Sequence, residues 1–182
     1  MSNDCCGNLK CVAKNKETLD RIMKILKYED SEFCIHRCKD AQDSESYKDG
    51  DLWVKDIYVD GAWNCQQFFR CSDNPDDILI DGFEKDKDGN SIYEKPIYGT
   101  AHYTSLCHIA KVLDCGFELY STEPGMGFWE HLTCNHNGEL IIDETGDYEL
   151  GEDDESFTID GEDYDSFNEY MFTDEIYGKE NN

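Results

Sequence analysis

The amino-acid sequence predicts an α+β fold, with helices packed on an antiparallel sheet. Two stretches carry apolar residues at helical spacing, and several shorter stretches alternate apolar and polar residues as strands do. The third observation is residues 117–134, FELYSTEPGMGFWEHLTC, in which two strand-like runs flank a Pro-Gly turn. This stretch predicts the central hairpin of the sheet. The chain has 182 residues, of which 38% are hydrophobic and 13% aromatic, and this suffices for one packed domain with an appendage.

The first predicted strand covers residues 8–14, and the first predicted helix covers residues 16–27. Asn15 stands between them, where a helix needs an N-cap. Apolar residues at i, i+3, i+4 and i+7 form one stripe along this helix: Leu19, Ile22, Met23 and Leu26. We expect the stripe to face the sheet.

The next part of the chain predicts three strands. Residues 32–39 are expected to form one strand, and the polar residues 40–50 a loop. Residues 52–59 alternate well, with one change of phase that suggests a bulge. The Asp-Gly pair at 60–61 is typical of a hairpin turn, so residues 62–71 are expected to return as the partner strand.

A second hairpin and a second helix follow. Residues 78–83 and 91–98 are expected to pair around a turn at 87–90. Thr104 is the predicted N-cap of the second helix, and Gly116 is expected to end it as a C′ glycine. The apolar stripe of this helix consists of Leu106, Ile109, Ala110 and Leu113.

Beyond the central hairpin, an Asn-Gly turn at 137–138 leads to a short predicted strand at 139–143. The order strand, helix, strands, helix, strands fits a ferredoxin-like sandwich over residues 1–143. In that plan two helices cover one face of an antiparallel sheet, and the extra hairpins are additions. Residues 144–182 are expected to form an acidic, aromatic-containing C-terminal segment that docks on something.

The net charge of −26 comes from 42 acidic and 16 basic residues. Residues 143–182 carry −15 of it, with 16 acidic residues against Lys179 alone. This balance disfavours direct binding to nucleic acid or an anionic membrane, and it favours a basic partner. Neither a membrane span nor a secretory signal is visible, so we expect a cytoplasmic protein.

Ten cysteines are scattered without a Cys-x-x-Cys pair, and we expect reduced thiols in the core. Two groups of soft ligands could meet as halves of a zinc site. One has Cys34, His36 and Cys38 on one strand face, and the other is His131-x-x-Cys134-x-His136, with Cys134 and His136 on one face. Their spacings fit no short-loop zinc pattern. We therefore expect no metal and no cofactor.

No nucleophile elbow and no glycine-rich phosphate loop is present, and we expect no enzymatic activity. The rival hypothesis is a zinc-binding or acid–base enzyme centred on Glu130 and His131. A further alternative is a regulatory or structural interaction module whose charge serves only solubility.

Nucleic-acid mimicry is the sharper interpretation of the acidic surface, because spaced carboxylates can occupy a basic groove in place of phosphates. Aromatic residues among the acids would anchor such a complex. The expected partner-binding residues are the acids Glu152, Asp153, Asp154, Glu155, Asp160, Glu162, Asp163 and Asp165, the anchors Tyr164, Phe167 and Tyr170, and Glu123 and Glu130 as extensions of the acidic face.

Three segments resemble one protein family. They are residues 3–12 (NDCCGNLKCV), residues 60–65 (DGAWNC) and residues 123–131 (EPGMGFWEH) followed by Gly138 and Glu139. They are similar to motifs of the YubB-type ferredoxin-like domain family of plasmid, phage and integrated-element proteins. Asp4 departs from the family's usual Trp, and residues 99–101 depart from a Trp-Gly-Thr motif of some members.

The resemblance implies a ferredoxin-like fold and an origin in a phage or mobile element. It implies no reaction, because the family has no established catalytic residues. Together with the charge, it leads us to expect a non-catalytic inhibitor of anti-CRISPR or anti-restriction type. The expected partner is a basic nucleic-acid-binding host protein, such as a CRISPR effector or a restriction enzyme, in a bacterial cytoplasm.

Overall fold

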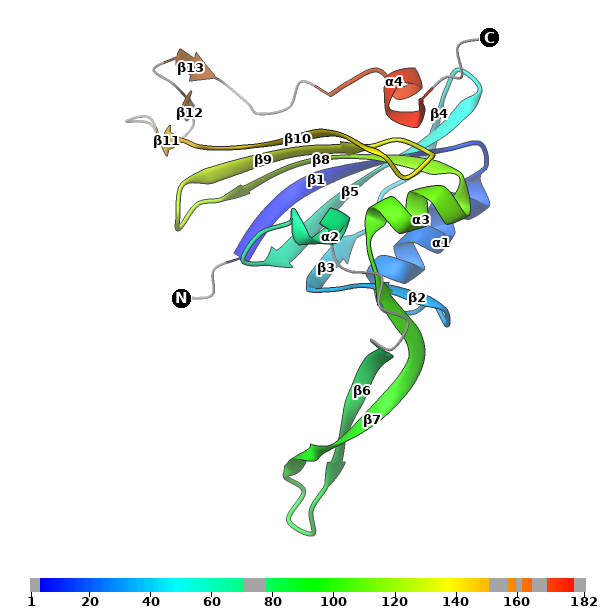
Figure 1. Cartoon of the computed structure of the whole chain (residues 1–182), viewed down its shortest axis with the longest axis vertical. Coiled ribbons are helices and arrows are strands. Elements are labelled where there is room, and N and C mark those ends of the chain that lie inside the picture. Colours follow the sequence, from blue (N-terminus) through cyan, green and yellow to red (C-terminus); the bar gives the residue numbers. More distant parts are fainter. Residues whose placement is uncertain (1–3, 71–77, 151–156, 160–161, 165–169, 179–182) are drawn as a thin grey trace.

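The computed structural model describes residues 4–70, 78–150, 157–159, 162–164 and 170–178. The fold is α+β and mostly antiparallel, as predicted. Its main sheet has seven strands in the order β10-β9-β8-β1-β5-β3, with β4 also paired to β5 (Figure 1). The bounds of these strands are β1 Asp4–Ala13, β3 Cys38–Gln42, β4 Tyr47–Asp49, β5 Leu52–Ala62, β8 Cys115–Glu123, β9 Phe128–Cys134 and β10 Leu140–Asp147.

Two smaller sheets and the helices complete the described part. One sheet joins β2 (Phe33–Ile35), β7 (Ser91–Thr104) and β6 (Ile78–Lys85). The other joins β11 (Glu149–Leu150), β12 (Phe157–Ile159) and β13 (Glu162–Tyr164). The helices are α1 Lys16–Leu26, α2 Gln67–Arg70, α3 Leu106–Leu113 and α4 Thr173–Tyr177. No helix in the described ranges is long and apolar enough to cross a membrane.

The main core lies between the sheet and the helices α1 and α3. Buried side chains of both predicted helical stripes join it, together with Leu9, Ile57 and Phe117 from the sheet. Asn15 caps α1 as predicted, accepting a hydrogen bond from the backbone N–H of Thr18 at 2.9 Å. The cap of α3 is Ser105 rather than Thr104, because the Ser105 hydroxyl receives the His108 N–H.

A smaller core covers the opposite face of the sheet. Neighbouring residues of a strand point to opposite faces, so Cys11 joins the main core while Val12 packs with Ile176 and Tyr177 of α4. Gly116 does not end α3, which stops at Asp114 in the left-handed region (φ 52°). It lies in β8, where a Cβ atom would stand 2.6 Å from the Ile176 carbonyl oxygen, so glycine is needed for this packing.

Two of the sequence predictions in the middle of the chain are wrong. Residues 32–39 do not form one strand, because Arg37 adopts φ 63° and separates β2 from β3. The Asp-Gly pair at 60–61 lies inside β5 and makes no turn. The chain turns later, at Trp63 (φ 75°), and the expected partner strand is replaced by α2, whose aromatic residues are buried.

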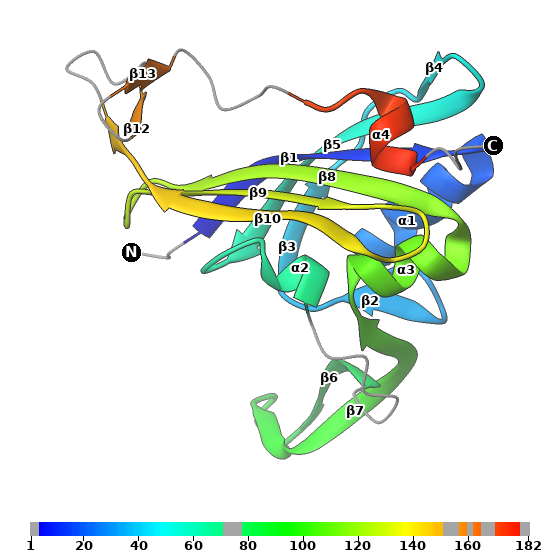
Figure 2. The same cartoon turned by 45° about the horizontal axis from the view of Figure 1, so that its top comes forward.

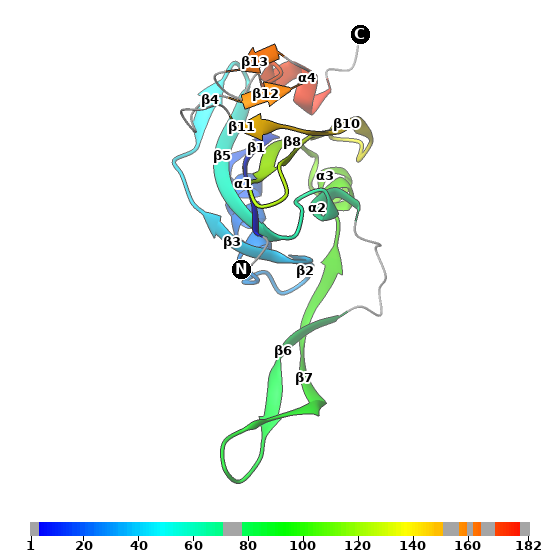
Figure 3. The same ribbon diagram turned by 90° about the vertical axis from the view of Figure 1, so that its left-hand side faces the viewer.

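The other two predicted hairpins are confirmed. The central hairpin pairs β8 with β9 from Phe117 opposite Cys134 to Glu123 opposite Phe128. The second hairpin, β6 and β7, projects from the body of the domain as a two-stranded arm (Figures 1 and 3). We call residues 78–104 the arm. It is held at its base, where β7 pairs in parallel with β2.

The acidic C-terminal segment begins within the sheet. Strand β10 crosses the predicted boundary at 143/144 and ends at Asp147. Residues 170–178 then lie against the sheet, where α4 contacts β8, β1 and β9 (Figure 2). The segment therefore docks on its own domain over this described part.

Candidate functional site

Glu130 is a buried carboxylate, and the expectation that it extends an acidic surface is wrong. Its side chain comes from β9 and is 3% exposed. Its Oε2 atom accepts the backbone N–H groups of Cys65 at 2.9 Å and Gln66 at 3.2 Å, and the Ser121 hydroxyl at 2.8 Å. These donors offset the cost of removing a charge from water. Glu130 thus ties the turn before α2 to the sheet.

Glu123 is buried as well, so its expected place on the acidic face is also wrong. Its carboxylate accepts the backbone N–H of Met126, and its backbone carbonyl accepts the N–H of Gly127 at 2.9 Å. Both contacts close the Pro-Gly turn of the central hairpin. No local pattern predicts this burial, because a glutamate before a turn is ordinarily solvated.

His131 lies on the opposite face of β9 from Glu130, since adjacent residues of a strand alternate. An acid–base site centred on both residues is therefore not formed. The His131 Nε2 atom lies 2.9 Å from Oε1 of Glu118, a fully buried glutamate of β8. Tyr120 stacks on the His131 ring at 4.0 Å.

Glu118 was missed by the sequence analysis, although a signal was present. It stands on the same hairpin face as Tyr120 and His131, so the pairing of the two strands places all three side chains on one surface. The C-terminal segment covers this surface. The backbone N–H of Met171 donates to both carboxylate oxygens of Glu118, at 3.2 and 3.0 Å.

Tyr170 also belongs to this contact. Its ring meets Tyr120 edge-on at 5.3 Å, and Lys10 lies 5.6 Å from its centroid. Burial, followed by the nearby Asp56 and Glu118 carboxylates, raises the pKa of the Tyr170 hydroxyl. A side chain engaged in this way holds the tail on its own domain, which argues against its expected role as an anchor for a partner.

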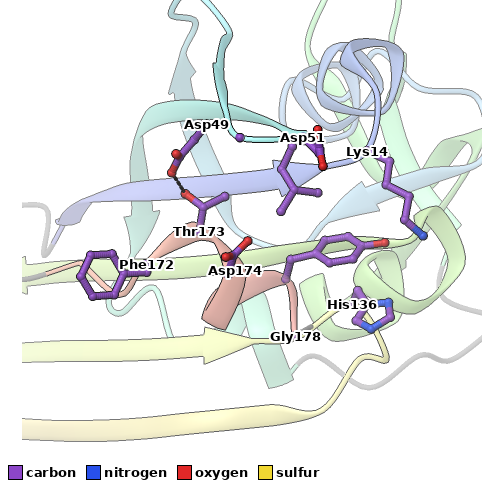
Figure 4. A pocket seen from close by; sticks show the side chains of 11 residues that line it. Lys14, Asp49, Asp51, His136, Phe172, Thr173, Asp174 and Gly178 are labelled. Carbon is purple, nitrogen blue, oxygen red and sulfur yellow. Dashed lines mark hydrogen bonds between the residues drawn. The ribbon is translucent and has the colours of Figure 1, made fainter. Parts of the chain in front are cut away.

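A cavity of about 580 Å³ lies between α4, the β4–β5 turn, Lys14 after β1 and the β9–β10 turn (Figure 4). Asp49, Asp51 and Asp174 line one side, beside Phe172, which is 80% exposed. The Thr173 hydroxyl bonds to Asp49 at 2.5 Å. We call Asp49, Asp51 and Asp174 the acidic rim. Carboxylates next to an exposed aromatic ring suit an ammonium or guanidinium group.

Three side chains on the other side of this cavity, those of Lys14, His136 and Tyr177, contact the Asp114 carboxylate and form the Asp114 network with it. This carboxylate lies 3.0 Å from Lys14 Nζ and 2.9 Å from His136 Nδ1, and it accepts the Tyr177 hydroxyl at 2.6 Å. Burial raises the pKa of Asp114, but the hydrogen bonds from Tyr177, Lys14 and His136 outweigh it and lower this pKa to about 2.

The two groups of soft ligands that were considered as halves of a zinc site do not meet. His36 packs edge-on against Tyr103, and His136 belongs to the Asp114 network. Within the described ranges one group of three metal-ligating side chains comes together, namely Cys5, Cys65 and Glu130. Of the nine described cysteines, seven are buried, which confirms the prediction that most serve as core residues.

Most of the predicted partner-binding residues of the tail lie outside the described residues: Glu152, Asp153, Asp154, Glu155, Asp160, Asp165 and Phe167. Glu162, Asp163 and Tyr164 form β13, of which the backbone alone is described. Strand β10, at the edge of the main sheet, leads into this tail. It carries exposed carboxylates at Asp143, Glu144 and Asp147, and Glu149 of β11 follows; we call these four residues the acidic edge.

The arm is a surface of a different kind, which the sequence analysis did not recognise. It holds five acidic and three basic residues, so it carries little of the net charge. Tyr93 is 74% exposed and Tyr98 62% exposed, and Ile80 and Ile97 are exposed beside them. A two-stranded ribbon is marginal by itself, and exposed apolar side chains of this size mark interaction sites.

No family model, no curated protein and no solved structure matches this chain.

Proposed function

We propose that this protein binds a basic nucleic-acid-handling protein of a bacterial host and blocks it by nucleic-acid mimicry. It acts without catalysis, as an anti-CRISPR or anti-restriction protein encoded by a phage or mobile element. It works in the host cytoplasm. The observation that carries the proposal is the acidic edge, a row of carboxylates held on a sheet edge that continues into the acidic tail.

The spacing of the acidic edge supports this proposal. A strand rises about 3.3 Å per residue, so the four carboxylates between residues 143 and 149 follow one another at roughly 6 Å along the chain. Asp143 points to the opposite face of β10 from Glu144 and is paired with Arg70. Glu144, Asp147 and Glu149 therefore carry the charge that a partner would meet. One strand of DNA carries a charge about every 3.4 Å. The edge alone is therefore a sparse imitation of a phosphate backbone. The four consecutive acids at 152–155 would raise the density where the tail begins.

The distribution of basic residues adds support. Several Lys and Arg side chains of the domain are already paired with carboxylates of the same chain. Arg70 pairs with Asp143, Lys55 with Asp43, and Arg21 with Asp30 and Glu32. With 42 acidic residues against 16 basic ones, most carboxylates have no positive charge of their own chain to offset them. A basic partner would supply that charge.

The arm would provide the apolar contacts of the complex. Binding energy at interfaces concentrates in a few aromatic side chains, while charge sets the rate of encounter and its salt dependence. Tyr93 and Tyr98 are such side chains, and they replace Tyr170 as the proposed anchors within the described part. The acidic rim offers a second place for basic side chains of the partner.

We also propose that the core is a ferredoxin-like sandwich. The strands β8, β1, β5 and β3 are neighbours and antiparallel, α1 follows β1, and α3 precedes β8. This order supports the plan with two helices on one face, to which β9, β10 and the arm are additions. Membership of the YubB-type family is proposed on the three segments that resemble it.

The test is capture from host lysate at low salt. The expected catch is a basic nucleic-acid-binding protein that is released by high salt and by added duplex DNA or RNA. In the variant Glu144→Gln/Asp147→Asn/Glu149→Gln, capture should fall. The matched control, Glu17→Gln/Glu29→Gln/Glu45→Gln, removes three exposed charges elsewhere and should capture as the wild type does. If added duplex DNA or RNA did not release the captured protein, mimicry would be refuted.

The arm favours a second candidate, an interaction module whose charge serves only solubility. In that case Tyr93→Ser/Tyr98→Ser would abolish capture, whereas the charge variant and high salt would leave it unchanged.

A further inference from the structure

Three segments that are far apart in the sequence bring Cys5, Cys65 and Glu130 together in the core. Cys5 comes from β1, Cys65 precedes α2, and Glu130 comes from β9. Their ligand atoms all lie within 4.8 Å of one another, and the three side chains are buried. The Cys5 Sγ atom is 3.7 Å from Oε2 of Glu130. These residues belong to the three segments that define the family resemblance, one to each.

The distances suit one tetrahedral ion. Zinc binds sulfur at about 2.3 Å and carboxylate oxygen at about 2.0 Å, which separates two such ligand atoms by roughly 3.5 Å. The observed 3.7 Å between Cys5 Sγ and Glu130 Oε2 is close to that separation. A small movement of side chains would therefore suffice to place an ion between them.

The surroundings of Glu130 resemble the outer shell of a metal site. Two backbone N–H groups and the Ser121 hydroxyl hold the carboxylate by donating to Oε2, and ligating carboxylates are held by such hydrogen bonds. An ion bound to Oε2 would take the place of the Ser121 O–H group at this oxygen. Ser121 also interacts with the Cys65 thiol. Its hydroxyl, or a water molecule, is the oxygen available for a fourth position.

Binding of zinc leaves the net charge of the buried cluster unchanged, so it adds no cost of burying charge. Without metal, the cluster holds one carboxylate and two neutral thiols, a net charge of −1. Binding Zn²⁺ releases the two thiol protons and leaves two thiolates, one carboxylate and the ion, again a net charge of −1. The thiolates favour zinc over magnesium or calcium, and the carboxylate disfavours Cu(I).

We propose that Cys5, Cys65 and Glu130 bind one Zn²⁺ ion, in departure from the expectation of no metal. The ion would fasten the turn before α2 to β1 and β9, so its role would be structural. Zinc binds thiolates, so it must displace the protons of both thiols, and uptake should strengthen as pH rises.

The test uses the full-length chain, reduced and purified without chelator. Elemental analysis should find about one zinc per chain. After the metal is removed, titration with Co²⁺ should produce a sulfur-to-cobalt charge-transfer band, and equimolar Zn²⁺ should raise Tm. Cys65→Ser should lose most of that band. Cys6→Ser, a change at the neighbouring residue on the other face of β1, should keep it. Ser121→Ala should weaken zinc binding by about tenfold or more.

Two results would overturn the proposal. One is a reduced wild-type chain that shows neither the charge-transfer band nor a rise in Tm. The other is a band of undiminished intensity in Cys5→Ser and Cys65→Ser. If these variants fail to fold, the wild-type titration decides alone.

Discussion

The backbone N–H of Met171 donates to both carboxylate oxygens of Glu118, at 3.2 and 3.0 Å, across 53 positions of sequence. A fully buried carboxylate on the sheet thus receives its hydrogen bonds from the C-terminal segment and from His131. Lys10 completes the contact by donating to the Met171 carbonyl at 3.3 Å. The start of the docked tail is therefore fixed by main-chain hydrogen bonds, and not only by the apolar side chains of α4.

Glu118→Ala should release this contact. The change leaves the Met171 N–H and His131 without their acceptor in a buried place, which costs about 1–3 kcal/mol for each unsatisfied group. Hydrogen–deuterium exchange should show protection lost at residues 170–177 and kept in β1. Glu144→Gln, an exposed change whose carboxylate is 3.8 Å from His131, is the control and should leave protection unchanged. Equal protection in both variants would show that Glu118 does not hold the tail.

Gly116→Ala should displace α4 and leave the main core in place. The added Cβ atom would stand 2.6 Å from the Ile176 carbonyl oxygen. Because this is a backbone atom, no side-chain rotation can relieve the clash, and α4 must move. We expect a loss of about 1–3 kcal/mol in the free energy of unfolding, measured in urea. Gly82→Ala is the matched control, because no atom lies within 4 Å of its added Cβ. If the two variants proved equally stable, the close packing of α4 on β8 would be wrong.

The Asp114 network should make stability depend on pH in acid. Its pKa of about 2 lies below the value of about 3.9 for an unfolded aspartate. A lowered pKa stabilises the fold above the unfolded pKa, and this stabilisation is lost as pH falls through about 4 towards 2. Asn tolerates the left-handed conformation at this position, so Asp114→Asn should be less stable than wild type at pH 6.

The difference between wild type and Asp114→Asn should then shrink towards zero near pH 2. Urea unfolding of both proteins between pH 6 and pH 2 measures it. Because the Asp114 side chain is half-exposed, solvent screening keeps the effect small. A difference that stayed constant over this range would contradict the lowered pKa.

Tyr93→Ser/Tyr98→Ser should weaken capture of the partner by about tenfold or more, because truncating an aromatic anchor costs over 1 kcal/mol. The change in Tm should be small, since both side chains are mostly exposed. Val112→Ser alters an exposed apolar residue of α3, outside the arm, the acidic edge and the acidic rim, and serves as the control for lost apolar surface. The arm has no role in binding if the double variant and the wild type capture the partner equally.

Local signals were sufficient for much of the fold. The stripes of α1 and α3, the Asn15 cap and the Pro-Gly turn of the central hairpin all act over a few residues, and they were predicted. The prediction of a turn at the Asp-Gly pair failed because Gly61 is needed for tertiary packing and not for a turn. A Cβ at Gly61 would lie 2.9 Å from the Phe68 ring, and the strand runs on through this point.

The burial of the glutamates could not be read from sequence patterns, although the central hairpin already put Glu118 on one face with Tyr120 and His131. Glu123, Glu130 and Glu118 look like solvated glutamates until the turn, α2 and the C-terminal segment place backbone N–H groups against them. The order of the sheet decides which donors arrive, and no local spacing encodes it. Composition shows where the acidic residues concentrate, but it does not tell which carboxylates are held on strands, and β10 runs across the predicted boundary at 143/144.

The most direct measurement of the central claim is the salt dependence of the affinity for the captured partner. Log Kd should rise steeply with log salt for the wild type. The slope should fall by about one for each contacting carboxylate that is removed in Glu144→Gln/Asp147→Asn/Glu149→Gln. The control Glu17→Gln/Glu29→Gln/Glu45→Gln should keep the wild-type slope. An affinity that did not change with salt, or a slope equal in all three proteins, would contradict mimicry by the acidic edge.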